Sequence, residues 1–213
     1  MTGTRHRTDD CRGRAALDET ERACLTVLVA ALIGFGAYGF QTAAPSTVAY
    51  LFTTSMVATT LVWFRRTPLP PRLTAALTVL AVAHLAGGLV RVGDNVLYNA
   101  QLGLPAVEYD HFVHAGAVLA GCLVLWDLFG RALGERPPRE LIVLCGLAAL
   151  GLGAVNEVIE FLTTQVHHGT HVGGYDNTGW DLVCNLIGAT IATARISKRH
   201  PAKLATDVDV AAA

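Results

Sequence analysis

The stretch that decides the fold is residues 140–166, which read ELIVLCGLAALGLGAVNEVIEFLTTQV. A membrane-spanning helix needs about 20 mainly apolar residues, and residues 141–155 carry no charged side chain. The same apolar run then holds Asn156, Glu157 and Glu160. An ionisable group in a membrane helix costs about 2.5–3.5 kcal/mol on insertion scales and usually faces the bundle. This stretch therefore predicts a membrane helix with a polar site near its end.

Five other apolar stretches are long enough, or nearly long enough, to cross a bilayer. They are residues 23–41, 46–64, 73–93, 111–134 and 180–196. The chain is 52% hydrophobic and 15% charged, whereas a soluble domain carries about a quarter charged residues. Because backbone groups in lipid must be paired within the chain, helices are the expected form. We predict an all-α bundle of six transmembrane helices at residues 23–196, between a disordered arm at 1–22 and a disordered tail at 197–213.

The basic residues predict the orientation of this bundle. The 16 Lys and Arg residues lie before the first stretch, after the last one, and in the second-to-third and fourth-to-fifth connections. Arg91 is the single exception. By the positive-inside rule, these connections and both termini face the cytoplasm. The predicted partner is the lipid bilayer, and a net charge of −1 offers no basic surface for nucleic acid.

The polar residues inside the apolar stretches gather where four of the helices reach the outer side. Asp110 and His114 are four residues apart, as are Asn156 and Glu160, so each pair shares a helical face. The other members are His84, Arg91, Asp94, Glu157, Asp176, Asp181 and Asn185. Because these residues, apart from the mid-helix His84, are expected at one side of the membrane, we predict a shared pocket that opens outward.

The residue types in this pocket indicate metal chemistry. Mixed carboxylate and imidazole ligands suit zinc, manganese or iron, and a bound metal makes water a nucleophile. The candidate metal ligands are His114, Asp181 and Glu160. The candidate catalytic residues are Glu157, Glu160 and Asp110. The residues expected to line the pocket are Arg91, Asp94, Asn156, Asp176, Asn185 and His84. On this interpretation the protein is a membrane hydrolase acting on a lipid or envelope substrate.

Other interpretations fit the same residues. Acidic and histidine side chains inside a bundle also form proton or cation relays in transporters, and an ion-pair network can simply hold helices together. Asp110 and Asp181 each open a predicted helix, where the helix dipole favours a carboxylate. His84 can hydrogen-bond within the bundle. Three histidines of the last loop have no assigned role: His167, His168 and His171.

Charge balance adds a geometric prediction. Two buried carboxylates one helical turn apart repel each other, so Glu157 and Glu160 need a cation or a proton nearby. We predict a side-chain oxygen of one of them within about 4 Å, the range of an ion pair, of Arg91 or of a His114 nitrogen. Glu160 is expected to face the cavity more directly than Glu157, because it shares a helical face with Asn156.

Several of these motifs resemble a known family. The matching pieces are Tyr109-Asp110-x-x-x-His114, Glu157-x-x-Glu160, and Gly173-Gly174-Tyr175-Asp176-x-Thr178-x-x-Asp181 followed by Asn185-Leu186-Ile187-Gly188-Ala189. Together they are similar to the YjdF-like bacterial inner-membrane proteins, a domain of unknown function. The resemblance covers most of residues 84–189 and implies a bacterial inner-membrane location, with no established activity. Asp176 and Asp181 are five residues apart here, where four are expected in some relatives, and Arg91 does not map onto the family.

Overall fold

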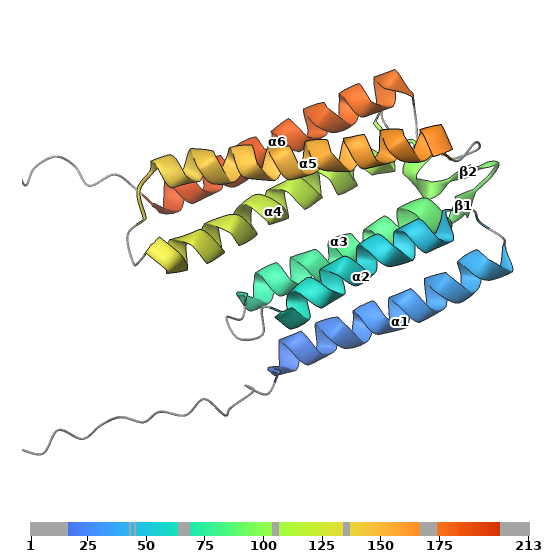
Figure 1. Ribbon diagram of the computed structural model, residues 1–213, viewed down its shortest axis with the longest axis horizontal. Helices are drawn as coiled ribbons and strands as arrows, with labels where there is room; N and C mark the ends of the chain where they lie inside the picture. The colour runs from blue at the N-terminus through green and yellow to red at the C-terminus, as the bar shows by residue number, and fades with distance from the viewer. Residues whose placement is uncertain are drawn as a thin grey trace, which may run out of the picture.

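Six helices run side by side in the computed structural model, which describes residues 17–42, 44, 46–63, 69–103, 107–133, 137–166 and 174–200 (Figure 1). Their bounds are Glu19–Gln41 for α1, Thr47–Trp63 for α2, Pro71–Leu89 for α3, Tyr109–Leu133 for α4, Glu140–Val166 for α5 and Tyr175–Arg199 for α6. Apart from one short hairpin, the described residues form an all-α protein, so the predicted fold class is confirmed. The loop histidines His167, His168 and His171, and most of the predicted arm and tail, lie outside the described residues.

The helices form two groups of three. α1, α2 and α3 pack against one another, as do α4, α5 and α6, and α3 packs on α4 where the groups meet. One apolar core includes Leu28 and Leu73, and the other includes Cys122 and Cys145. Figure 1 shows successive helices alternating in direction, so α1 begins and α6 ends at the same end of the molecule.

Four of the helices are long and apolar enough to cross a membrane: α1, α3, α4 and α5. α2 is apolar but shorter, and α6 is 25 residues long with several polar residues on one face. The outward side chains of α5 are apolar. Val143, Leu147, Leu152, Val155 and Ile159 are each more than half exposed, as expected for a surface that contacts lipid.

The third helix ends earlier than the sequence predicts. α3 stops at Leu89 and the chain turns into an antiparallel hairpin. The next elements are β1 (Arg91–Val92), β2 (Asn95–Val96) and the 3-10 helix η2 (Leu97–Asn99). Gly93 in the turn has φ +62°, a left-handed conformation that costs glycine little. The prediction of a helix through residue 93 is therefore wrong at its end, because Arg91 and Asp94 lie exposed in the hairpin.

The last helix begins earlier than predicted. α6 starts at Tyr175, so Asp181 lies in its second turn. Because the dipole effect is confined to the first turn, the interpretation of Asp181 as a helix-opening charge is wrong. Asp110 does lie in the first turn of α4. The early start also adds Asn177 to the face of α6 that carries Asp181 and Asn185, since these residues are spaced by four.

A close crossing brings α6 onto α4. A Cβ atom at Gly188 would lie 2.2 Å from the backbone oxygen of Ala115, so this separation of the helices requires glycine. Ala115 follows His114 in the sequence, and Gly188 lies two turns beyond Asp181 on α6. The crossing therefore sets how closely Asp181 approaches His114.

Candidate functional site

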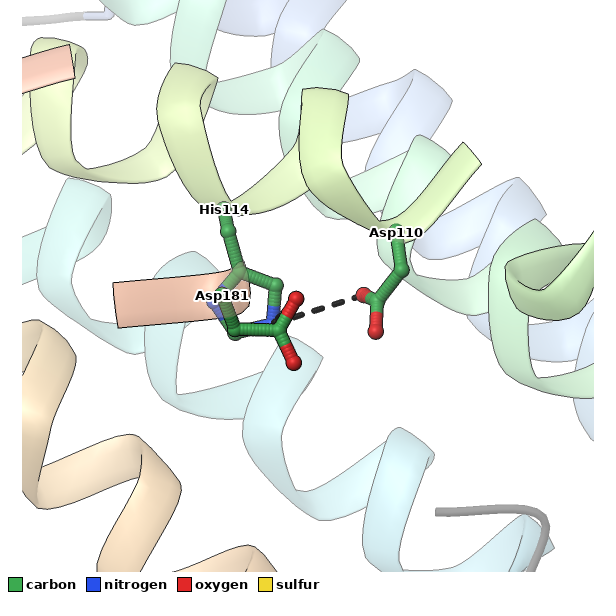
Figure 2. Close-up of side chains that lie close together, drawn as sticks. All are labelled: Asp110, His114 and Asp181. Atoms are coloured by element: carbon green, nitrogen blue, oxygen red, sulfur yellow. Dashed lines mark ion pairs between the residues drawn. The ribbon is translucent and has the colours of Figure 1, made fainter. Parts of the chain in front are cut away.

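A buried histidine of α4 stands at the centre of the polar residues. His114 is 8% exposed, and its Nε2 lies 3.4 Å from Oδ1 of Asp110, one turn earlier on the same helix. The same nitrogen is 4.0 Å from Oδ1 of Asp181 on α6. Figure 2 shows the three side chains converging from the two helices. One ligand atom of each lies within 4.8 Å of the others, which is close enough for all three to share a cation.

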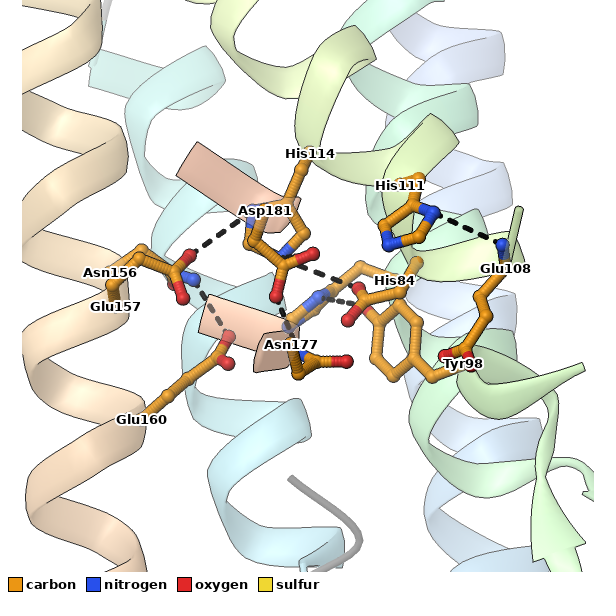
Figure 3. Close-up of polar contacts among 11 residues, drawn as sticks. His84, Tyr98, Glu108, His111, His114, Asn156, Glu157, Glu160, Asn177 and Asp181 are labelled. Atoms are coloured by element: carbon orange, nitrogen blue, oxygen red, sulfur yellow. Dashed lines mark hydrogen bonds and ion pairs between the residues drawn. The ribbon is translucent and has the colours of Figure 1, made fainter. Parts of the chain in front are cut away.

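The other ring nitrogen of His114 faces a different carboxylate. Its Nδ1 is 3.2 Å from Oε1 of Glu157 on α5 (Figure 3). The predicted approach of an α5 carboxylate to Arg91 or His114 is therefore confirmed, through His114. Arg91 instead lies in the hairpin, where its Nη2 donates to the backbone oxygen of Asp94 at 3.4 Å.

Some buried oxygens of this group have no hydrogen-bond partner among the described residues. They are Oδ1 of Asp181, which is fully buried, and both carboxylate oxygens of Glu157, which is 4% exposed and whose Oε1 lies within ion-pair range of His114 but accepts no hydrogen bond from it. The other oxygen of Asp181 accepts a hydrogen bond of 2.5 Å from Nδ2 of Asn177. A buried carboxylate oxygen without a partner is unfavourable, and a cation bound beside His114 would satisfy it.

The charges of this cluster are out of balance. The carboxylates of Asp110, Glu157, Glu160 and Asp181 surround one imidazole, and a protonated His114 would neutralise only one of them. Repulsion between like charges is strong where water is excluded. A divalent cation offsets two negative charges at once, so the composition of the cluster suits a metal.

Glu160 lines the cavity beside the cluster, as predicted. Nδ2 of Asn156 donates to Oε1 of Glu160 at 2.7 Å, and both side chains line the cavity, whereas Glu157 is buried against His114. His114, Glu157 and Glu160 form a second group whose ligand atoms lie within 4.8 Å of one another. Because a neutral imidazole offers one lone pair, His114 can serve only one of the two groups at a time.

The cavity has a volume of about 200 Å³. Its polar lining includes His114, Asn156, Glu160 and Asn185. Small or apolar residues form most of the remaining wall: Val113, Ala117, Val118, Gly121, Ala149, Leu152 and Gly153. Asn185 is 1% exposed, and neither atom of its amide has a partner in the described part of the chain. The cavity therefore combines an unsatisfied amide with an apolar surface.

His84 closes the cavity on the side of α3. The Tyr98 hydroxyl lies 2.5 Å from Nδ1 of His84, and it donates to this nitrogen if the imidazole is neutral with its proton on Nε2. In this form Nε2 donates to Oγ1 of Thr53 at 2.9 Å. The Thr53 hydroxyl donates in turn to the backbone oxygen of Ala49. His84 lies in the pocket as predicted, but both of its nitrogens are engaged, so it is not available as a metal ligand.

Three residues predicted for the pocket lie elsewhere. Arg91 and Asp94 are exposed in the hairpin, and Asp176 is exposed in the first turn of α6. All three are near the same end of the molecule as the cluster, but none of them lines the cavity.

Asn177, Tyr98 and Thr53 contact residues of the site and were not predicted. Asn177 stands four positions before Asp181, a spacing that becomes informative once α6 is known to begin at Tyr175. Tyr98 offers no such signal, because η2 reaches His84 only through the turn of the hairpin.

Comparisons with known proteins bear on the class of this chain. Residues 21–202 match a family described as predicted membrane protein (DUF2238). No curated protein and no solved structure matches the chain. The match extends over all six helices apart from the first two residues of α1.

Proposed function

The chain belongs to the DUF2238 family of predicted membrane proteins and is an integral multi-pass membrane protein; from that premise we propose that it is a metal-dependent hydrolase of a lipid or envelope substrate. The observation that carries the proposal is the convergence of Asp110, His114 and Asp181, where an oxygen of Asp181 on the side of His114 has no hydrogen-bond partner among the described residues. Zinc, manganese or iron suits such a mixed set of oxygen and nitrogen ligands.

We infer that His114 binds the metal through Nε2. Nε2 is 3.4 Å from Oδ1 of Asp110 and 4.0 Å from Oδ1 of Asp181, so these three side chains would hold the ion between α4 and α6. Nδ1 would then carry the proton and face Oε1 of Glu157 at 3.2 Å, the position from which a carboxylate commonly orients a metal-bound histidine. In this proposal Asp110 takes the place of Glu160 in the ligand set predicted from the sequence.

Glu160 is the proposed general base. A divalent cation held by Asp110, His114 and Asp181 would make a water lose its proton near neutral pH. Glu160, held by Asn156 at the cavity wall, accepts that proton and returns it to the leaving group, so that hydrolysis of an ester yields an acid and an alcohol. Glu157 contributes by orienting His114.

We propose that all six helices cross the inner membrane of a bacterium, with both termini in the cytoplasm. The distribution of basic residues supports this orientation, and the alternating directions of the helices fit an even number of crossings (Figure 1). The resemblance to YjdF-like proteins supports the bacterial inner membrane. The metal site would then open to the outer side.

Elemental analysis of the purified protein tests the metal centre. We expect a stoichiometric divalent cation in the wild type and its loss in both His114→Ala and Asp181→Asn. His111→Ala is the matched control. His111 is also buried on α4, but its Nδ1 accepts from the backbone N–H of Glu108 at 3.1 Å, on the side away from the carboxylates (Figure 3).

Activity is tested separately with a chromogenic p-nitrophenyl ester. We expect hydrolysis by the wild type, and its loss in Glu160→Gln with the metal retained.

A protein that neither carries nor takes up a divalent cation would contradict the proposal. If such a protein moved cations into liposomes in response to a pH difference, it would be a transporter. Without flux, the cluster would serve only to hold the helices together.

A further inference from the structure

The cavity beside the candidate metal site is continued by a second one. This second cavity has a volume of about 80 Å³, and both cavities are lined by His84, Asn156 and Glu160. The remaining wall comes from α2 and α5: Ser46, Ala49, Tyr50, Thr53, Ile159 and Thr163. The two cavities therefore adjoin at Glu160, and the second lies between α2 and α5.

The side between α2 and α5 is open. Within the described residues, α2 packs closely on α1 and α3, and α5 on α4 and α6, but α2 and α5 do not pack closely on each other. Ala49 on α2 and Ile159 on α5 are both exposed. Because α5 is one of the helices apolar enough to cross a membrane, an opening on its exposed side would face the bilayer, near the ends of α2 and α5 where Ser46 and Thr163 lie.

The first cavity changes from polar to apolar with depth. At 1.5 Å per residue, Gly121 on α4 lies about 10 Å further into the membrane than His114. Between these levels Ala117 and Val118 form the wall, and a Cβ atom at Gly121 would meet nothing within 4 Å. Apolar cavities bind water poorly and apolar ligands well, so the inner end suits an alkyl chain.

We infer that this cavity takes one acyl chain of a membrane lipid, which enters from the bilayer between α2 and α5 and leaves its ester group beside Asn185 and Glu160. The amide of Asn185, which has no partner within the described segments, donates to the ester carbonyl, and the acyl chain fills the apolar end near Gly121. This inference rests on the proposed hydrolase and deepens it, because it makes the substrate a lipid acyl ester and not a soluble envelope compound.

A spin-labelled monoacylglycerol tests this inference on the full chain in phosphatidylcholine vesicles. In the wild type, electron paramagnetic resonance should detect more immobilised probe than the layer of boundary lipid around any membrane protein accounts for. Gly121→Leu fills the inner end and Ala49→Trp obstructs the opening, so both should lose this signal. The matched controls Gly151→Leu and Val48→Trp should keep it, because both positions are exposed and line neither cavity.

The same samples separate this inference from the metal proposal. Metal content equal to that of the wild type shows that the two cavity variants are folded, and Asp181→Asn should lose the metal yet keep the probe. If the wild type, the cavity variants and the controls gave identical signals, the immobilised probe would be boundary lipid only. That result would overturn the inference about the cavity and would leave the metal proposal unaffected. Probe binding by a wild type without metal would support the cavity and overturn the hydrolase.

Discussion

His114 has one lone pair to give in its neutral form, and its nitrogens face opposite directions. Nε2 faces Asp110 and Asp181, and Nδ1 faces Glu157. The neighbouring side chains therefore decide where a cation sits. Asn177 binds one oxygen of Asp181 and leaves the oxygen on the Nε2 side without a described partner. Because this oxygen of Asp181 faces Nε2 of His114, we place the metal between α4 and α6.

Removing this support should weaken the metal site without removing a ligand. Asn177→Ala leaves the second oxygen of Asp181 without its donor, and loss of such an outer-shell partner typically lowers metal affinity about 10–100-fold. Competition of the protein with a chelating dye for zinc or manganese measures the change. Asp176→Ala is the control, because this neighbour is exposed, and its metal affinity should match that of the wild type. An equal loss in both variants would point to damage to the start of α6 and not to the role of Asn177.

At the scale of elements, the crossing of α4 and α6 holds the site together. Gly188→Ala would place a Cβ atom 2.2 Å from the backbone oxygen of Ala115, and backbone atoms cannot move aside as the end of a side chain does. We expect a loss of about 1–3 kcal/mol in the free energy of unfolding, as for other overpacked contacts. Because the helices must separate, metal affinity should fall as well. Denaturant unfolding in detergent and the dye competition measure the two effects.

The matched substitution is Gly151→Ala on the exposed side of α5. Its Cβ atom would meet nothing within 4 Å, and alanine is the better helix former by about 1 kcal/mol. We therefore expect stability equal to the wild type or slightly higher. A Gly188→Ala protein as stable as this control would show that the crossing tolerates a side chain.

At the scale of the whole molecule, the orientation decides which compartment the site faces. Alkaline phosphatase, which is active only outside the cytoplasm, should be active when fused at Ala44, Gly103 or Gly174 and inactive at Leu69 or Pro138. The reason is that the basic connections stay in the cytoplasm. If the fusion at Gly174 were inactive while the fusion at Gly103 was active, the polar ends of α3 and α6 would lie on opposite sides of the membrane. Such a topology is incompatible with the shared cluster, so this result would contradict the predicted orientation.

The sequence by itself determined the features that depend on neighbours along the chain. Six apolar stretches predict six helices because lipid leaves the backbone no partner except itself. The pairs Asp110–His114 and Asn156–Glu160 follow from the helical period, and both contacts are present in the structure. The gathering of polar groups at one end follows from the alternating directions of successive helices.

Only the tertiary structure decided which of these groups meet. Arg91 and His114 were both candidate partners for the α5 carboxylates, but Gly93 permits a hairpin in which Arg91 is exposed. The approach of Asp181 to His114 depends on the close crossing at Gly188, and the contact of Tyr98 with His84 depends on the path of the chain after α3. Such contacts join residues that are distant in sequence. They depend on the volumes and backbone separations of several elements at once, which neither spacing nor periodicity along one segment encodes.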